Sequence, residues 1–164
     1  MATREEVASE LQAVVERAEA LAARLDQKDL ECPTCEGGWT VKEVFAHLAS
    51  MGGSPGFFLA MAQRAQSGGG SGGGGLGAGF DIDAFNAQQV SARKEKTLKE
   101  LLDEFRQGHE QGIAMIRSAA DDLLSKQMPD PFRGGMSTPL EMIKGSCCEH
   151  EAAHLDEVEA ALKR

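Results

Sequence analysis

The sequence predicts an all-α fold, a four-helix bundle with long connections between its helices. The chain is rich in Ala, Leu, Glu, Lys and Gln, and no stretch shows the alternation typical of a β-strand. Thr-x-x-Glu also stands four times ahead of a run of apolar residues at helical spacing. In this capping box, each side chain accepts a hydrogen bond from the other residue's backbone N–H, so each box predicts the start of a helix. The four boxes are Thr3 with Glu6, Thr40 with Glu43, Thr97 with Glu100, and Thr138 with Glu141.

Length and charge restrict the class of protein. The 164 residues suit one domain over residues 1–164 with a proper core. The net charge of -9, without a Lys/Arg cluster, argues against nucleic acid as a partner. We expect no membrane partner, because no apolar run approaches the ~18 residues of a span and the N-terminus lacks signal-peptide features. A cytoplasmic protein with four mainly reduced cysteines is therefore expected.

The first helix is predicted at about residues 3–27, because apolar residues recur there every three or four positions. These are Val7, Leu11, Val14, Ala18, Leu21 and Leu25. A loop over residues 30–38 should follow. It contains Cys32 and Cys35 in a C-P-T-C motif that resembles half of a zinc knuckle or a redox pair. The second half of such a knuckle is missing.

The second helix should begin after Thr40, with Trp39 and Val44 forming a hydrophobic staple around the cap. Its apolar stripe is Val41, Val44, Leu48 and Met51, with Phe45 and His47 alongside. Glycines and a proline at residues 52–56 predict a kink, after which the helix resumes over residues 55–66. Residues 67–79 are nearly all glycine and predict a flexible surface loop.

Two further helices and a connection complete the expected bundle. Asp83 is predicted to cap a short helix that ends near Arg93. The third long helix should cover residues 97–123, weakened in its middle by Gly108 and Gly112. Its seam residues are Leu98, Leu102, Phe105, His109, Ile116 and Ala119. Residues 125–137 form a long connection, and the last helix covers residues 138–163, with Pro139 at its first position.

The last helix carries two histidines, His150 and His154, four residues apart. This spacing places both imidazoles on one helical face, where they can reach a single metal ion. The apolar register of Ile143, Cys147 and Val158 predicts that this face is turned toward the protein interior. Two solvated histidines on a terminal helix are the alternative.

A third ligand must come from another helix. Three neutral imidazoles can hold a divalent metal with one coordination position open, an arrangement typical of catalytic sites. His47 and His109 are the only other histidines, and their spacing makes them nearly equal candidates. Each, considered alone, is more often a hydrogen-bonded core residue than a metal ligand.

Three short segments resemble the signature of the DinB/YfiT-like superfamily. Residues 38–49 read GWTVKEVFAHLA, residues 81–86 read DIDAFN, and residues 150–155 read HEAAHL. The resemblance implies a four-helix bundle, often dimeric, that holds a divalent metal such as zinc or nickel with three side chains. It implies His47, His150 and His154 as the metal ligands. His109 has no counterpart in the pattern and is expected to be a packing residue.

The resemblance also implies a class of activity. The superfamily includes enzymes that use mycothiol or bacillithiol, such as maleylpyruvate isomerase and S-transferases. That isomerase has a glutamate where this chain has His150, so the likeness is to the superfamily and not to that enzyme. We expect a metal-dependent transferase, isomerase or hydrolase that acts on a small molecule, as a homodimer, with a low-molecular-weight thiol as cosubstrate.

Two other functions fit the same residues. One is a non-catalytic, metal-containing ligand-binding or stress-response protein, and the other is a dimerisation module without metal. No catalytic residue is assigned. The aromatic residues Phe57, Phe58 and Phe85 could line a substrate cavity at the mouth of the bundle.

Polar residues near the histidine pair have simpler expected roles. Cys147, one turn before His150, should be a small buried apolar residue. Cys148 points in a different direction from Cys147, so a zinc site that joins the adjacent pair to the C-P-T-C motif is not expected. Glu43, Glu149 and Glu151 should be solvated or capping, with the option of orienting a ligand imidazole.

Overall fold

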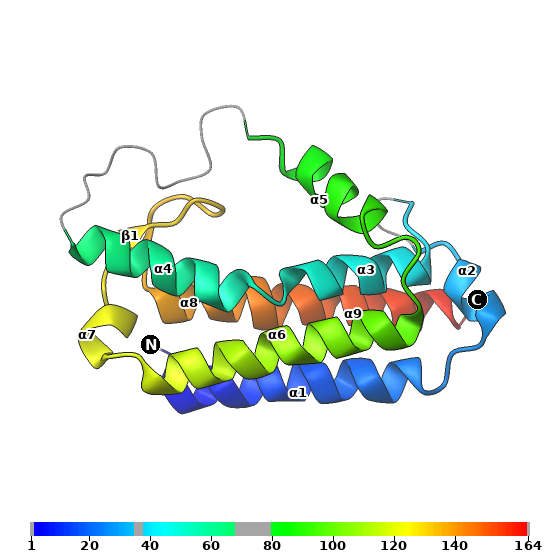
Figure 1. Ribbon diagram of the computed structural model, residues 1–164, viewed down its shortest axis with the longest axis horizontal. Helices are drawn as coiled ribbons and strands as arrows, with labels where there is room; N and C mark the ends of the chain where they lie inside the picture. The colour runs from blue at the N-terminus through cyan, green and yellow to red at the C-terminus, as the bar shows by residue number, and fades with distance from the viewer. Residues whose placement is uncertain (1, 35–37, 68–79, 164) are drawn as a thin grey trace.

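The computed structural model describes residues 2–34, 38–67 and 80–163. Four helical rods lie side by side in it, which confirms the predicted four-helix bundle (Figure 1). The second rod is divided by a kink, and the last is continuous through a π-helical segment. The rods are α1 (Arg4–Ala22), α3 with α4 (Val41–Met51 and Ser54–Gln66), α6 (Leu98–Ser118), and α8, η1 and α9 (Pro139–Ile143, Lys144–Glu149 and His150–Ala161).

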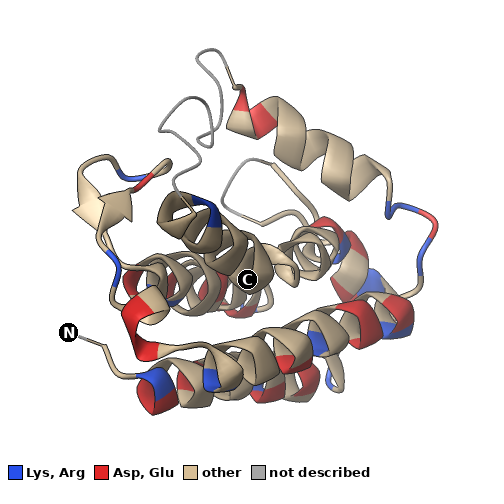
Figure 2. Ribbon diagram, turned by 60° about the vertical axis from the view of Figure 1, so that its left-hand side comes forward, with Lys and Arg blue, Asp and Glu red and all other residues tan. Residues whose placement is uncertain are grey.

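Smaller elements connect the rods. They are α2 (Gln27–Glu31), α5 (Ile82–Ser91), α7 (Asp121–Leu124), β1 (Met128–Pro129) and β2 (Met136–Ser137). Helix α5 lies outside the bundle against α3 (Figure 1). Acidic and basic residues are interspersed along the helices in the view of Figure 2, which shows no continuous basic face.

All four predicted capping boxes form, so the helix starts after Thr3, Thr40, Thr97 and Thr138 are confirmed. The predicted end of the first helix at residue 27 is wrong. Helix α1 ends at Ala22, and a separate helix, α2, begins at Gln27. The break arises because the Asp26 carboxylate accepts hydrogen bonds from the backbone N–H groups of the next helix and so acts as a new N-cap.

Two other helix boundaries also differ from the prediction. Helix α6 stops at Ser118, five residues before the predicted end at residue 123, because Ala119 is extended with ψ 147°. Helix α7 then begins as a separate turn. At α5 the N-cap is Asp81, whose side chain accepts from the backbone N–H of Ala84, while Asp83 lies in the first turn.

The connection before the last helix contains a short antiparallel hairpin that the sequence analysis did not expect. Met128 pairs with Ser137, and Pro129 pairs with Met136. Strands of two residues are too short to show alternation, so no periodic signal could reveal them. The predicted glycine-rich loop, apart from Ser67, lies outside the described residues, as does Cys35.

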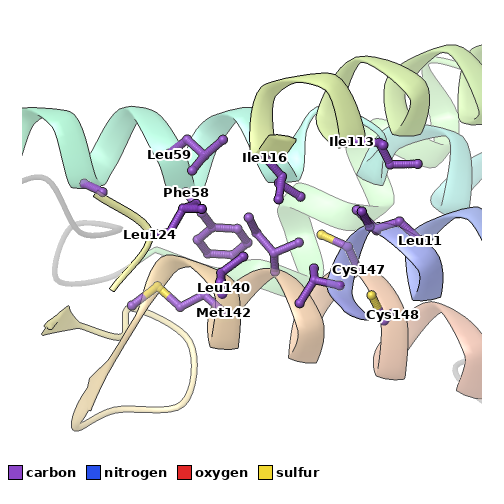
Figure 3. Packing of buried hydrophobic residues seen from close by; sticks show 14 of the residues in the cluster. Leu11, Phe58, Leu59, Ile113, Ile116, Leu124, Leu140, Met142, Cys147 and Cys148 are labelled. Carbon is purple, nitrogen blue, oxygen red and sulfur yellow. The ribbon is translucent and has the colours of Figure 1, made fainter. Parts of the chain in front are cut away.

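The buried apolar residues form two clusters along the bundle. Figure 3 shows the cluster nearer the hairpin, in which Phe58 of α4 packs among residues of α1, α6, α8 and η1. The second cluster, around Phe45 and Phe105, surrounds the part of the bundle from which the histidines of α3 and α9 project. Of the apolar stripe predicted for the second helix, Val41, Val44 and Leu48 are buried as expected, whereas Met51 is only partly buried.

Within the described chain, Val41–Gln66 is the one stretch long and apolar enough to cross a membrane. This differs from the expectation that no apolar run in the sequence approaches the length of a membrane span. More than half of its most apolar window is buried inside the bundle, as in the core helix of a soluble protein.

Gly108 and Gly112 allow α6 to approach the kink between α3 and α4. A Cβ at Gly108 would lie 2.6 Å from the Cα of Gly52, and a Cβ at Gly112 would lie 2.8 Å from the Pro55 ring. Their low helix propensity, noted above, is therefore the cost of a close helix contact. We expect Gly108→Ala to reduce the free energy of unfolding by about 1–3 kcal/mol in a denaturant titration, because the clash is with backbone atoms.

Gly56→Ala is the matched control for this prediction. Its Cβ would make ordinary contact with the Met115 side chain at 3.5 Å. Alanine should therefore be neutral or stabilising there by up to about 1 kcal/mol. Equal effects at Gly56 and Gly108 would contradict the close-approach explanation.

Candidate metal centre

His47 of α3 and two histidines of α9, His150 and His154, come together at one side of the bundle. One potential ligand atom from each ring lies within 4.8 Å of the others. The Nε2 atoms of His150 and His154 are 3.1 Å apart. The ring centroid of His47 lies 5.8 Å from that of His150 and 4.9 Å from that of His154. The structure therefore brings together the three histidines that the family resemblance implies.

His109 is not part of this group. It points into the bundle from α6, with its ring nitrogens engaged by Phe105 and Glu151. The residue is fully buried, in agreement with its expected role as a packing residue.

The exposure of the α9 histidines differs from the prediction. His154 is 6% exposed, but His150 is exposed and not on the buried face. The reason is the π-helical segment η1, in which the backbone N–H of His150 donates to the carbonyl of Gly145, five residues earlier. The wider turn shifts the buried register from Cys147 to Glu151. His150 is thereby turned to the rim of the site.

Trp39 lies over the histidines. Its ring centroid is 5.1 Å from that of His47 and 6.5 Å from that of His154. The backbone of Trp39 is held in position, because its carbonyl accepts hydrogen bonds from both the backbone N–H and the hydroxyl of Thr34. The Thr40 cap then starts α3, which places His47 two turns along the helix on its inward face.

Burial lowers the pKa of the His47 imidazole to about 3, and the nearby rings of His154 and His150 act in the same direction. His47 is therefore neutral near pH 7, the form in which imidazole binds a metal. Its Nδ1 is buried and has no hydrogen-bond partner among the described residues. A metal bond is one way in which such an imidazole compensates for its burial.

His154 has a carboxylate partner beside the triad. Its Nδ1 lies 3.2 Å from Oε2 of Glu157, one turn further along α9. A carboxylate in this position orients a metal-binding imidazole and raises its basicity. The donor set and its surroundings fit a divalent transition metal.

Because of His47, the free energy of unfolding of the metal-free protein should fall in acid. The unfolded residue has a pKa of 6.5 and the folded one of about 3, so the unfolded chain binds an extra proton between these values. Stability that is complete above pH 6.5 is then lost as pH falls toward 3. His47→Gln should reduce the difference in unfolding free energy between pH 7 and pH 4.5 by about 2–3 kcal/mol.

Denaturant titrations at both pH values, with a chelator present, measure this difference. Glu151 contributes with the opposite sign, because its raised pKa favours the folded state at low pH, but this contribution is common to both proteins. Parallel stability curves for wild type and His47→Gln would contradict the prediction.

The triad opens onto a cavity of about 800 Å³. Its walls are mainly apolar and come from α3, α4, α5, the β1–β2 hairpin and η1. Phe57, Phe58 and Phe85, the aromatic residues expected at the mouth of the bundle, all line it. A small organic molecule in this cavity would therefore lie against the histidines.

Glu151 is the main residue that the sequence analysis misplaced. It was expected to be solvated or capping, but its side chain is fully buried and its Oε2 lies 2.8 Å from His109 Nε2. Burial raises the pKa of the Glu151 carboxyl to about 7, although the hydrogen bond from His109 acts in the opposite direction. Its Oε1 has no hydrogen-bond partner within the described chain. No signal in the sequence distinguishes Glu151 from its exposed neighbour Glu149, because the π turn decides which of them is buried.

The other polar residues near the site behave as expected. Glu43 caps α3, and Glu149 is exposed. Cys147 and Cys148 are buried, and burial raises the pKa of the Cys147 thiol well above its usual range and that of Cys148 to about 12. Both side chains are therefore neutral thiols packed in the core, not nucleophiles.

Comparison with known proteins gives a family and a fold. A sequence profile of the DinB superfamily matches residues 10–158. No match to the chain was found among curated proteins.

Solved structures with the same fold include YfiT from Bacillus subtilis, a probable metal-dependent hydrolase with an unusual four-helix bundle topology. It has a TM-score of 0.74 and 18% identity, over 98% of this chain and 86% of YfiT. The mycothiol-dependent maleylpyruvate isomerase has a TM-score of 0.68 and 11% identity, over 96% of this chain and 61% of its own. TT2238, a four-helix bundle protein, has a TM-score of 0.59 and 26% identity, over 96% of this chain and 99% of its own.

Proposed function

The chain belongs to the DinB superfamily, and from this premise we propose that it is a metal-dependent enzyme acting on a small organic molecule. The observation that carries the proposal is the triad itself. Three imidazoles have ligand atoms within 4.8 Å of one another and open directly onto an apolar cavity of about 800 Å³. A ligand set and a substrate space therefore adjoin each other.

His47, His150 and His154 would hold the metal, with zinc or nickel as the expected ion. A divalent metal bound by three imidazoles supplies a Lewis acid with an open coordination position. The protein contributes the rest. Burial keeps His47 neutral, Glu157 orients His154, and Trp39 covers the two buried rings against water.

Two reaction classes follow from the proteins that share the fold. YfiT is a probable hydrolase, and the isomerase depends on mycothiol. We propose hydrolysis, or isomerisation or group transfer with a low-molecular-weight thiol as cosubstrate. The buried thiols Cys147 and Cys148 make an external thiol the better source of sulfur, because neither cysteine lines the cavity.

Metal loading tests the proposal. Chelator-treated protein should take up about one zinc or nickel ion per chain, measured by elemental analysis, and its melting temperature should rise with the metal. Entry of a small thiol into the coordination shell should then produce a sulfur-to-nickel absorption band in the near ultraviolet. Protein that takes up no metal would exclude the enzyme and favour a plain dimerisation module.

An unchanged spectrum on thiol addition would exclude the thiol-dependent reactions and leave the hydrolase. Metal-loaded protein should in that case cleave simple esters or amides faster than the chelated protein does. Absence of this activity would favour the non-catalytic, metal-containing ligand-binding protein.

The proposal also covers the cellular compartment, the oligomeric state and the partners of the protein. We propose a cytoplasmic homodimer that has neither nucleic acid nor a membrane as a partner, as the family resemblance and the net charge of -9 suggest. Sedimentation equilibrium of the full chain tests the dimer, and a monomer at micromolar concentration would contradict it.

A further inference from the structure

Arg133 lines the same cavity as the three histidines. It is the one Arg or Lys among the described residues of the lining, and Asp83 is the one carboxylate. In a protein with a net charge of -9, an arginine at the edge of a mainly apolar cavity calls for an explanation. A guanidinium offers a planar fork of N–H donors to an anion.

The β1–β2 hairpin holds Arg133 in place. The carboxylate of Asp130, which is only 6% exposed, accepts hydrogen bonds from the backbone N–H groups of Phe132 and Arg133. Gly134 and Gly135 close the turn with φ of +73° and +79°, values that favour glycine. The turn therefore fixes the backbone from which both cavity-lining side chains, Phe132 and Arg133, project.

The guanidinium lies against Gly145 in the π-helical segment. A Cβ at Gly145 would be 2.1–2.2 Å from three guanidinium atoms of Arg133, so in this conformation the guanidinium occupies the space that a side chain at residue 145 would fill. Gly145, Ser146 and His150 line the cavity from this one segment. The π turn thus places Gly145, against which the guanidinium lies, and His150, a candidate metal ligand, on the same wall of the cavity.

Within the described chain, Arg133 has no strong ion pair that would compete with a ligand anion. Its ion-pair partner is Glu149, at 3.6 Å, and the side chains of both residues are more than half exposed. Exposed pairs of this kind contribute little, so a ligand anion can replace the Glu149 carboxylate.

The rest of the lining suits the body of such a ligand. Phe57, Phe80, Phe85 and Phe132 are 40–46% exposed, although all four line the cavity. Aromatic contacts link them in part, with ring centroids 5.4 Å apart for Phe80 and Phe85. Apolar surface left open around a cavity is buried by an apolar ligand.

We propose that Arg133 is the anion-binding group of this cavity and that its ligand is a small organic anion, a carboxylate with an apolar, aromatic-sized body. The inference rests on the proposed function in identifying this ligand with the substrate. The acid group would pair with Arg133, the body would lie on the phenylalanines, and the reacting part would face the histidines.

Isothermal titration calorimetry with phenylacetate and its neutral isostere, phenylacetamide, tests the proposal. We expect the acid to bind about 5- to 10-fold more tightly than the amide, both to chelator-treated protein at pH 8 and to metal-loaded protein. Arg133→Gln should remove this preference. Arg64→Gln, which makes the same charge change on an exposed arginine of α4 outside the cavity, should retain it.

A second variant keeps the test informative even if Arg133→Gln alters the hairpin. Glu149→Gln frees the guanidinium of its partner and should tighten phenylacetate binding about 2- to 3-fold. A purely structural role for Arg133 does not predict this gain. Equal binding of acid and amide, no binding of either, or an unchanged preference in Arg133→Gln would each overturn the proposal.

The results also separate this inference from the proposed function. Acid preference in a protein that takes up no metal contradicts the enzyme and leaves the anion site in place. Metal uptake without acid preference leaves the metal centre and contradicts the anion site.

Discussion

His150→Ala is expected to weaken divalent-metal binding by about 100-fold or more, because it removes one of the three proposed protein ligands. His150 is exposed and belongs to neither buried apolar cluster, so the substitution should leave the fold intact, which the melting temperature of the metal-free variant checks. Loss of the metal can then be assigned to the lost ligand and not to unfolding. Elemental analysis after dialysis, with calorimetric titration of zinc or nickel, measures the effect.

The matched control is Asp83→Asn, which removes the one carboxylate among the described residues that line the cavity. It should leave the affinity unchanged if the three histidines are the ligands. Glu157→Gln should give an intermediate loss of about 10-fold, because Glu157 orients His154 without being counted as a ligand. Unchanged metal content in His150→Ala, or its loss in Asp83→Asn, would show that the ligand set is different.

His109→Leu and Glu151→Leu are each expected to reduce the free energy of unfolding by about 3–5 kcal/mol. Their side chains are fully buried, and each supplies the hydrogen-bond partner of the other across α6 and α9. Either single change leaves a buried polar or charged group without its partner, which is more costly than the pair itself. Denaturant titrations at pH 7 measure the loss.

The double variant should be more stable than the sum of the two losses predicts, because two apolar side chains replace a pair that is costly to bury. Glu151→Gln is the conservative control. It retains a hydrogen-bonding group for His109 and should lose only about 1 kcal/mol. Additive losses in the double variant would mean that the two residues do not act as a pair.

The fold could be predicted because its main determinants are local. Thr3, Thr40, Thr97 and Thr138 each satisfy backbone groups within one turn of the same chain, so the capping boxes can be recognised without the tertiary structure. Helix ends were less predictable. Helix α1 ends at Ala22, although the apolar spacing continues to Leu25, and Asp26 then starts a new helix. Apolar periodicity alone could not reveal this break between the two helices.

The candidate site, like the fold, could be predicted only in part. The four-residue spacing of His150 and His154 indicated a pair, and the resemblance around Trp39 and His47 indicated the third histidine. The residues that surround the triad could not be predicted from the sequence. Glu157 could be recognised as a neighbour of His154, but its contact with the ring depends on side-chain packing.

By itself, the sequence determined the class of fold, the starts of the four helices that begin with a capping box, and the identity of the histidines that meet. These properties depend on local hydrogen bonding, helical periodicity and a short family signature. The tertiary structure alone decided that His150 is exposed, that Glu151 is buried against His109, and that Arg133 lies over Gly145. The physical reason is that one π turn changes which side chains face inward. A hairpin of two-residue strands adds the arginine, and its contact with Gly145 links residues too far apart for a local pattern to relate.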